Sequence, residues 1–168
     1  MEMGTRIPKT LFIVILLAAL AEGVRNFSLL PDRMASHFAS SGVPNGWMSK
    51  PQFFELNAIL IALAAAVGFL PPLLVANASP SRINLPNKEY WLAPGRHAET
   101  LAFFEKQFAW FGCVFLLLLF SVMELVVQVN LSPTPLLSTG PFLLLISAFV
   151  LFTMVWSLAM LRRFSNPR

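Results

Sequence analysis

The chain has 168 residues, of which 57% are hydrophobic and only 12% charged, and its mean hydropathy is +0.70. Soluble globular domains carry about 25% charged residues, so this composition all but excludes a soluble domain, and it argues equally against disorder, which needs low hydrophobicity and high charge. Twelve Lys and Arg against eight Asp and Glu give a net charge of +4, an excess that the basic bias of cytoplasmic membrane loops explains without any nucleic-acid partner.

Four stretches are apolar over the roughly 20 residues that a helix needs to cross the hydrocarbon core. We expect spans at about 11–30, 53–76, 108–131 and 141–161. None alternates between apolar and polar residues with a period of two, which argues against a β-barrel. The predicted fold is an all-α integral membrane protein, in which residues 1–168 form a single domain of four transmembrane helices.

The distribution of Lys and Arg predicts the orientation of this bundle, because cytoplasmic loops carry the excess of basic residues. The predicted inner side holds nine of them: Arg6, Lys9, Arg82, Lys88, Arg96, Lys106, Arg162, Arg163 and Arg168. The predicted outer side has only Arg33 and Lys50, with Arg25 inside the first span near that side. We therefore expect both termini on the cytoplasmic side of the cell membrane.

The N-terminal stretch allows a second interpretation. Basic residues, an apolar run and Ala19-Leu20-Ala21 resemble a signal peptide with its cleavage site. Cleavage there would leave three helices and an outer N-terminus, so we expect the stretch to be retained as the first span.

The outer loop, residues 31–52, contains signals for ordered structure. Pro31 and Asp32 can begin a short helix, since proline is tolerated in the first turn and an acidic residue is favoured there. Met34, His37 and Phe38 would then share one face of that helix.

The second half of this loop is rich in turn signals. We expect Gly42 to stop the short helix and Pro44-Asn45-Gly46 to form a turn. Trp47 would return the chain to the membrane surface, and Lys50 would open the second span. The loop is therefore predicted to be a compact lid on the bundle.

The inner segment, residues 77–107, begins with a turn at Pro86-Asn87 and continues into a helix. Pro94 suits the first position of a helix that begins near Ala93. That helix would run through Arg96 and Lys106 into the third span, which gives a long helix with a polar cytoplasmic first third.

Two motifs in these segments resemble a known family. They are Pro31-Asp-Arg…Ser36-His-Phe…Gly42-Val-Pro-Asn-Gly-Trp-Met-Ser-Lys50 and the stretch Ile83-Asn-Leu-Pro-Asn-Lys-Glu-Tyr-Trp-Leu-Ala-Pro94. They are similar to signatures of a prokaryotic membrane family of unknown function, whose best known relatives are the SdpI-type immunity and signalling proteins.

The resemblance implies that the outer loop recognises a ligand or partner and that the inner segment couples to a cytoplasmic or membrane partner. The outer-site residues would be His37, Phe38, Gly42, Pro44, Asn45, Gly46, Trp47 and Lys50. The inner-segment residues would be Asn84, Pro86, Asn87, Tyr90 and Trp91.

His37 is the most suggestive single residue, because histidine changes charge near neutral pH and can sense pH, relay protons or bind a metal. It can equally be a structural histidine that ties the loop to a carbonyl group. His37 and Glu55 are conceivable cation ligands by residue type, but no spacing typical of a metal site is present. We therefore predict no metal and no cofactor.

Glu22, Arg25 and Glu124 form a polar cluster inside the spans. Ionisable groups cost about 2.5–3.5 kcal/mol each in the hydrocarbon, so they normally face the bundle and pair. At 1.5 Å per residue, Glu22 and Glu124 lie roughly 10–12 Å from the outer ends of their spans. Arg25 could bridge both carboxylates, either as a clamp that fixes packing or as part of a polar cavity under the loop.

Enzymatic chemistry has little support in the chain. No serine lies in a nucleophile-elbow context, no glycine-rich phosphate loop is present, and the single cysteine, Cys113, is predicted to be a packing residue within the third span.

We expect a non-enzymatic membrane protein that lies in the lipid bilayer and acts in recognition, with a protein partner or as a homo-oligomer. The alternatives are an accessory subunit of a larger transporter or respiratory complex, and a small proton- or ion-coupled transporter.

Overall fold

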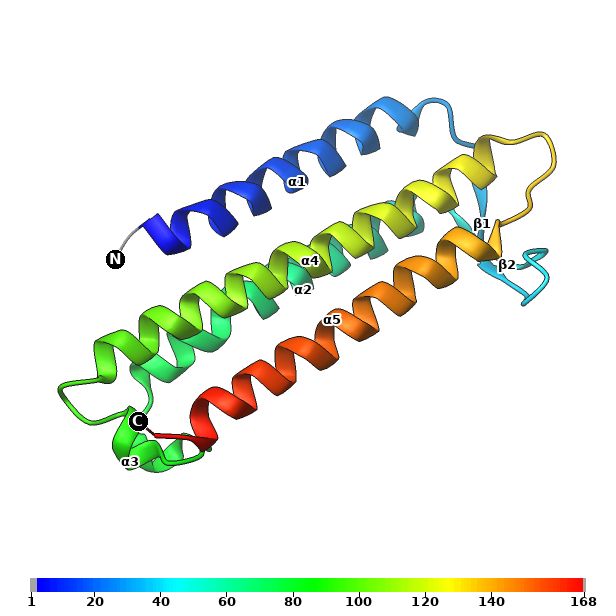
Figure 1. Cartoon of the computed structure of the whole chain (residues 1–168). Helices are drawn as coiled ribbons and strands as arrows, with labels where there is room; N and C mark the ends of the chain where they lie inside the picture. Colours follow the sequence, from blue (N-terminus) through cyan, green and yellow to red (C-terminus); the bar gives the residue numbers. More distant parts are fainter. Residues whose placement is uncertain (1–2, 168) are drawn as a thin grey trace.

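The computed structural model describes residues 3–167. Its elements, in chain order, are α1 (Met3–Phe27), β1 (Arg33–Phe38), β2 (Pro44–Ser49), α2 (Lys50–Asn77), the 3₁₀ turn η1 (Pro80–Arg82), α3 (Lys88–Trp91), α4 (His97–Leu131) and α5 (Thr139–Ser165). The four long helices run side by side, with both termini at one end of the bundle and the β1–β2 hairpin at the other (Figure 1). We call these the termini end and the hairpin end.

All four long helices are long and apolar enough to cross a membrane: Thr5–Phe27 within α1, and the whole of α2, α4 and α5. The predicted fold class, four transmembrane helices with an ordered segment between the first two, is confirmed. α1 ends at Phe27 rather than near residue 30, because the amide groups of Leu29 and Leu30 both bond to the Asn26 carbonyl in a closing turn. α2 runs unbroken through Pro71-Pro72 to Asn77.

α4 is the central helix, against which α1, α2 and α5 pack. α2 approaches α4 closely at a pair of glycines, where a Cβ added to Gly112 would lie 2.8 Å from the Gly68 Cα. Ala64, one turn away on α2, is fully buried. Small residues of this kind let helix backbones approach within a membrane, where packing replaces the hydrophobic effect as the source of helix association.

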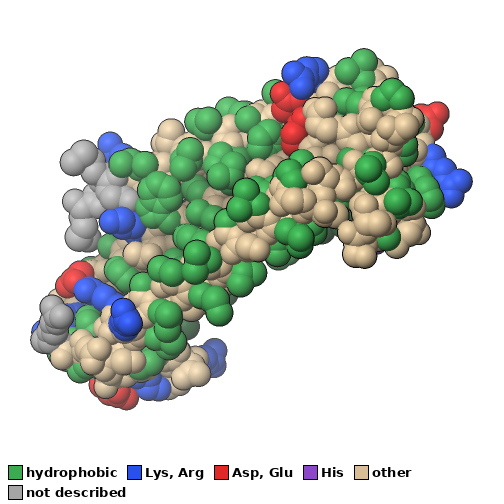
Figure 2. All heavy atoms as spheres, turned by 45° about the vertical axis from the view of Figure 1, so that its right-hand side comes forward, with side chains coloured by type: hydrophobic (Ala, Val, Ile, Leu, Met, Phe, Trp, Pro, Cys, Tyr) green, Lys and Arg blue, Asp and Glu red, His purple; other side chains and the backbone are tan. Residues whose placement is uncertain are grey.

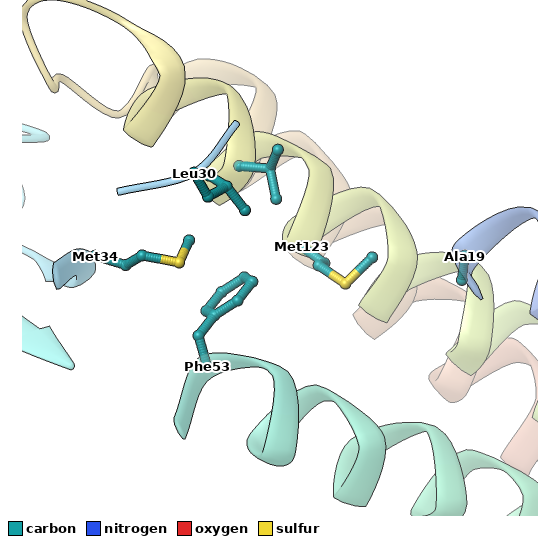
Figure 3. Packing of buried hydrophobic residues seen from close by; sticks show 6 residues of the cluster. Ala19, Leu30, Met34, Phe53 and Met123 are labelled. Carbon is teal, nitrogen blue, oxygen red and sulfur yellow. The ribbon is translucent and has the colours of Figure 1, made fainter. Parts of the chain in front are cut away.

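Three clusters of buried side chains hold the bundle together from end to end. The middle cluster consists of Phe12, Ile15, Ala64, Cys113 and Leu116, and the cluster at the termini end of Trp91, Phe104 and Phe164. The cluster at the hairpin end consists of Ala19, Leu30, Met34, Phe53, Met123 and Val127 (Figure 3). Met34 comes from the hairpin itself, so the hairpin is part of the core.

The outer surface has the distribution of side chains that a bilayer requires. Hydrophobic side chains cover the flanks of the bundle, and charged ones gather mainly towards its two ends (Figure 2). The basic residues assigned to the inner side belong to the N-terminal part of α1, the connection 78–96, the beginning of α4 and the end of α5, which all lie at the termini end; Arg168 lies outside the described residues. Which side of the membrane this end faces stays a prediction.

The glycine contact between α2 and α4 generates a stability prediction. Gly112→Ala forces the two backbones apart and is expected to destabilise the bundle by about 1–3 kcal/mol, as overpacked cores do. Gly140→Ala is the matched control, because a Cβ there meets nothing within 4 Å, and a change within about 0.5 kcal/mol is expected. Unfolding midpoints in mild detergent measure both, and equal midpoints for the two variants would contradict the packing described.

Candidate functional site

The segment after α1 is an antiparallel hairpin and not the short helix that the sequence predicts. Arg33 pairs with Ser49, Met34 with Met48, Ala35 with Trp47 and His37 with Gly46. The expected helix, from about Pro31 to Gly42, would have about three turns and would leave its first four amide groups and last four carbonyl groups without partners in the helix. The strand pairing satisfies those groups, and it places Met34 and Met48 together on the face that packs into the bundle.

The turn of the hairpin lies at residues 39–43, so the expectation of a turn at Pro44-Asn45-Gly46 is wrong: these residues belong to β2. The Ala39 amide donates to the Val43 carbonyl at 2.9 Å, and the Gly42 amide to the Ala39 carbonyl at 2.8 Å. Gly42 has φ +81°, which L side chains rarely adopt, and an added Cβ would lie 2.1 Å from the Leu137 carbonyl oxygen. The Leu137 amide donates to the Gly42 carbonyl at 2.9 Å, which ties the turn to the α4–α5 connection.

The amide side chain of Asn130, at the end of α4, holds the outer edge of β1. Its Oδ1 accepts from the Ala35 backbone amide at 2.7 Å, and its Nδ2 donates to the Ala35 carbonyl at 3.0 Å. These are the two bonds that a neighbouring strand would form. Nδ2 also donates to the Val126 carbonyl at 2.8 Å, which fixes the direction of the amide. The hairpin is therefore bonded to α4 as well as packed on it.

Lys50 fixes the other side of the hairpin. Its Nζ donates to the Leu30 carbonyl at 3.0 Å, lies 3.4 Å from an oxygen of Asp32 and sits 5.0 Å from the centre of the Phe27 ring. Its side chain is only 14% exposed. Lys50, predicted as a binding residue, joins the end of α1 to the start of α2.

His37 is exposed on the hairpin and lies directly across from Gly46. A Cβ added to Gly46 would lie 2.9 Å from the His37 Cβ and 3.1 Å from its Nδ1, so the imidazole occupies the space that a side chain at Gly46 would need. The Ser36 Oγ lies 3.1 Å from Nδ1, within hydrogen-bonding distance. The glycine at position 46 therefore makes room for the His37 ring.

His37 and Phe38 line a cavity of about 430 Å³ between the hairpin and the ends of α4 and α5. Three residues that carry hydroxyl groups, Ser36, Ser40 and Thr139, also line it. The remaining lining residues are apolar: Ala39, Val122, Leu125, Val126, Leu137, Phe142 and Leu143. The cavity is therefore an apolar space with several polar groups, and three separate segments of the chain build it.

The other predicted outer-site residues do not line this cavity. Trp47 is 49% exposed, and the Arg33 guanidinium lies 5.6 Å from its ring centre. Asn45 is exposed and Pro44 is half-buried. The residues of the outer-loop motif thus fall into three groups: some line the cavity, some build the hairpin, and some lie on the surface of the hairpin.

The intramembrane cluster is only partly formed. Arg25 pairs with Glu22 on its own helix at 2.5 Å, and Asn26 donates to the same Glu22 oxygen at 3.3 Å. Glu124 instead accepts from Gln128 at 2.6 Å, and its Oε2 is buried without a hydrogen-bond partner among the described residues. The expected bridge from Arg25 to both carboxylates is wrong, because equal depth on two helices does not bring their side chains to the same face.

The described residues contain no group of three or more His, Cys, Asp or Glu side chains that could hold a metal ion. Glu55 is exposed at the start of α2. The residue types that bind cations are thus scattered over the hairpin end.

The predicted inner segment closes the termini end of α5. The Phe164 carbonyl, at the end of that helix, accepts from Asn87 Nδ2 at 2.9 Å and from Trp91 Nε1 at 3.0 Å. Asn87 has the left-handed conformation, φ 52°, in the turn that the sequence predicts at this position. The Arg96 guanidinium lies 3.9 Å from the Tyr90 ring centre, whereas Asn84 and Pro86 lie in the connection that precedes α3.

Sequence reasoning missed three contributors to the hairpin end: Asn130, Leu137 and Thr139. Asn130 is 95 residues from its partner Ala35, and a single asparagine near a helix end carries no local signal for such a contact. The α4–α5 connection is short and contains two prolines, which identifies a loop but not what it touches.

Residues 13–61 match a family described as a domain of unknown function (DUF1648). The matched stretch contains most of α1, the whole hairpin and the first part of α2. No curated protein and no solved structure matches the chain. The description of the family assigns no activity, and the resemblance to SdpI-type proteins stays a prediction.

The Asn130–Ala35 contact generates a prediction for hydrogen exchange. Asn130→Leu removes both bonds and leaves the Ala35 amide and carbonyl unpaired near the membrane, a loss of about 1–3 kcal/mol. Amide exchange in the peptide covering residues 31–38 is expected to accelerate at least about tenfold. Asn77→Ala is the control, because Asn77 Nδ2 bonds only to the Leu73 carbonyl of its own helix; unchanged exchange in Asn130→Leu would show that this contact does not hold the hairpin.

Proposed function

We propose that this protein is a non-enzymatic receptor of the prokaryotic cytoplasmic membrane. Its hairpin end faces the outside and recognises a ligand, and the protein acts in immunity or signalling. The observation that carries the proposal is the cavity between the hairpin and the ends of α4 and α5. Small-molecule sites in proteins typically occupy about 300–1,000 Å³ and combine apolar walls with a few polar groups, and this cavity fits that description.

The lining of the cavity favours an amphipathic ligand. Apolar side chains of α4 and α5, among them Val122, Leu125 and Phe142, would contact an acyl or other hydrophobic portion. The imidazole of His37 and the hydroxyl groups from the hairpin would contact a polar portion. Such a ligand is expected at the boundary between a membrane and water, where an apolar body and a polar group are both accommodated.

The rigidity of the cavity wall supports binding over a purely structural role. Asn130 fixes the edge of β1, and the Gly42–Leu137 contact fixes the turn. A binding site that is already ordered loses less conformational entropy when a ligand arrives.

The distribution of basic residues supports the outward orientation. The termini end carries most of the Lys and Arg residues, whereas the hairpin end carries Arg25, Arg33 and Lys50. Cytoplasmic ends carry the excess of basic residues in membrane proteins.

α5 offers a route from the cavity to the inner segment. Its first turn forms part of the cavity wall, while its last turn is held by Asn87 and Trp91 through the Phe164 carbonyl. Phe164 is the one residue of α5 that is fully buried in the described part of the chain. A ligand that shifts the first turn of α5 would therefore move a helix that is anchored at its far end beside α3.

The proposal predicts a bound molecule that depends on free space in the cavity. Native mass spectrometry of protein purified from its own membranes is expected to show an adduct, which Val122→Trp removes by filling the cavity. His37→Ala is expected to lower occupancy about tenfold, the effect of one lost hydrogen bond to a polar ligand group. Leu158→Trp is the control on the exposed face of α5; a wild-type protein without adduct, or equal loss in the control, would contradict the proposal.

The biological role can be tested without knowing the ligand. A strain that lacks the gene and carries Val122→Trp is expected to keep the transcript profile and growth of the deletion strain, although the variant is inserted in the membrane at normal levels. Leu158→Trp should restore the wild-type profile. Full restoration by Val122→Trp would refute a receptor role for this cavity.

A further inference from the structure

A two-stranded sheet has two outer edges, and the two edges of this hairpin differ. In an antiparallel pair, residues alternate between those whose amide and carbonyl groups face the partner strand and those whose groups face away. Both backbone groups of Ala35 bond to Asn130, so they face away from β2. The edge of β1 is therefore occupied by the side chain of α4.

The same alternation fixes the direction of the backbone groups in β2. Trp47 is paired with Ala35, so the amide and carbonyl of Trp47 point away from β1. Ser49, two residues further along, is consistent with this direction, because its amide donates to Gln52 Oε1 at 3.0 Å rather than to a carbonyl of β1. Among the described residues, no hydrogen bond from another segment reaches the Trp47 backbone, and Trp47 and Asn45 are exposed. The edge of β2 is thus open.

An open edge is a template for another strand, and soluble proteins normally block such edges. This chain blocks β1 with an asparagine and leaves the edge of β2 uncovered. The exposed strand is short, since Pro44 has no amide to donate and the Ser49 amide is already bonded. The free groups centre on Trp47.

The hairpin lies in a position that suits pairing between neighbours in one membrane. Its strands cross the hairpin end of the bundle (Figure 1). Met34 and Met48 are paired, so they lie on one face of the sheet, and both pack in the core cluster at this end. The plane of the sheet therefore lies across the helix axes, and its open edge faces sideways. Two copies inserted in the same direction carry this edge at the same height.

We propose that the open edge of β2 pairs with β2 of a second copy of the chain, antiparallel, about a two-fold axis parallel to the helices. Trp47 of each copy lies beside the axis, where its amide donates to the carbonyl of the other Trp47. Directly opposed residues lie on the same face of a sheet, so the two indole rings meet on the side away from the bundle. A four-stranded sheet then covers both hairpin ends.

A second copy fits this edge better than a free extended peptide. The edge offers few backbone bonds, and a peptide would have to lose its conformational entropy to form them. A second copy presents a strand that is already ordered, and insertion in the same bilayer fixes its height and direction. Closed two-fold pairing of identical surfaces is also the commonest arrangement of homo-oligomers.

Trp47→Pro tests the pairing with little effect on the hairpin, because the amide it removes is not used in the β1–β2 ladder and proline is tolerated at sheet edges. The stoichiometry of the full chain in lipid nanodiscs is counted by single-molecule photobleaching. The wild type is expected to be dimeric, and Trp47→Pro should raise the dissociation constant at least about tenfold by removing both bonds across the axis. Trp47→Ala keeps the amide, so its dimer is expected to have a lower dissociation constant than that of Trp47→Pro.

A second variant keeps the test decisive if Trp47→Pro does not fold. In a Cys113→Ala background, Trp47→Cys is expected to form a disulfide across the axis on mild oxidation, since directly paired residues have Cα atoms about 5.5 Å apart. Val43→Cys, at an equally exposed position in the turn, should not. A monomeric wild type, or equal cross-linking at both positions, would overturn the proposal; a monomer that binds added extended peptides would assign the edge to a peptide partner instead. The adduct measured by native mass spectrometry is a separate readout, so either proposal can fail alone.

Discussion

The hairpin end depends on one requirement: the backbone groups of β1 must be hydrogen-bonded at the boundary of the hydrocarbon, where water is scarce and an unpaired group costs several kcal/mol. Asn130 meets this requirement by offering Ala35 an acceptor and a donor, as a neighbouring strand would. With that edge fixed, Met34 is held in the core and the side of the hairpin that carries His37 faces α4 and α5. The cavity is a consequence of this arrangement, because the hairpin is bonded to α4 at one position and leaves space beside it.

α4 connects this end to the other. It begins beside α3, where the Thr100 hydroxyl donates to the Trp91 carbonyl at 2.8 Å, and its last turn carries Asn130. α2 is fitted against it by the close approach of two glycines. α5 packs on α4 through aromatic rings in its middle, among them Phe149 and Trp156, and its termini end is held around Phe164. A central helix beside a helix that reaches from the cavity to the inner segment is a suitable arrangement for passing a change at the cavity to that segment.

The sequence predicted the elements that depend on composition. It could not predict the contacts that depend on strand pairing or on the face of a helix from which a side chain points. The four spans follow from hydropathy, and the turn at Asn87 follows from its local residues. The hairpin was missed because Met34, His37 and Phe38 have helical spacing, and only the pairing with β2, set by the bulged register at Ser36, decides against it. The bridge from Arg25 to Glu124 failed because depth in the membrane says nothing about which face of a helix a residue occupies. The cavity required contacts between segments about 100 residues apart.

The central claim is that the hairpin end binds a ligand beside His37. The chain has two histidines, and His97 lies at the start of α4, at the opposite end of the bundle. NMR spectra of protein with isotope-labelled histidine therefore report on each end separately. Spectra recorded before and after bound molecules are removed by exhaustive detergent exchange are predicted to differ in the His37 signals, while those of His97 remain unchanged. Unchanged His37 signals, or equal shifts at both histidines, would contradict the account.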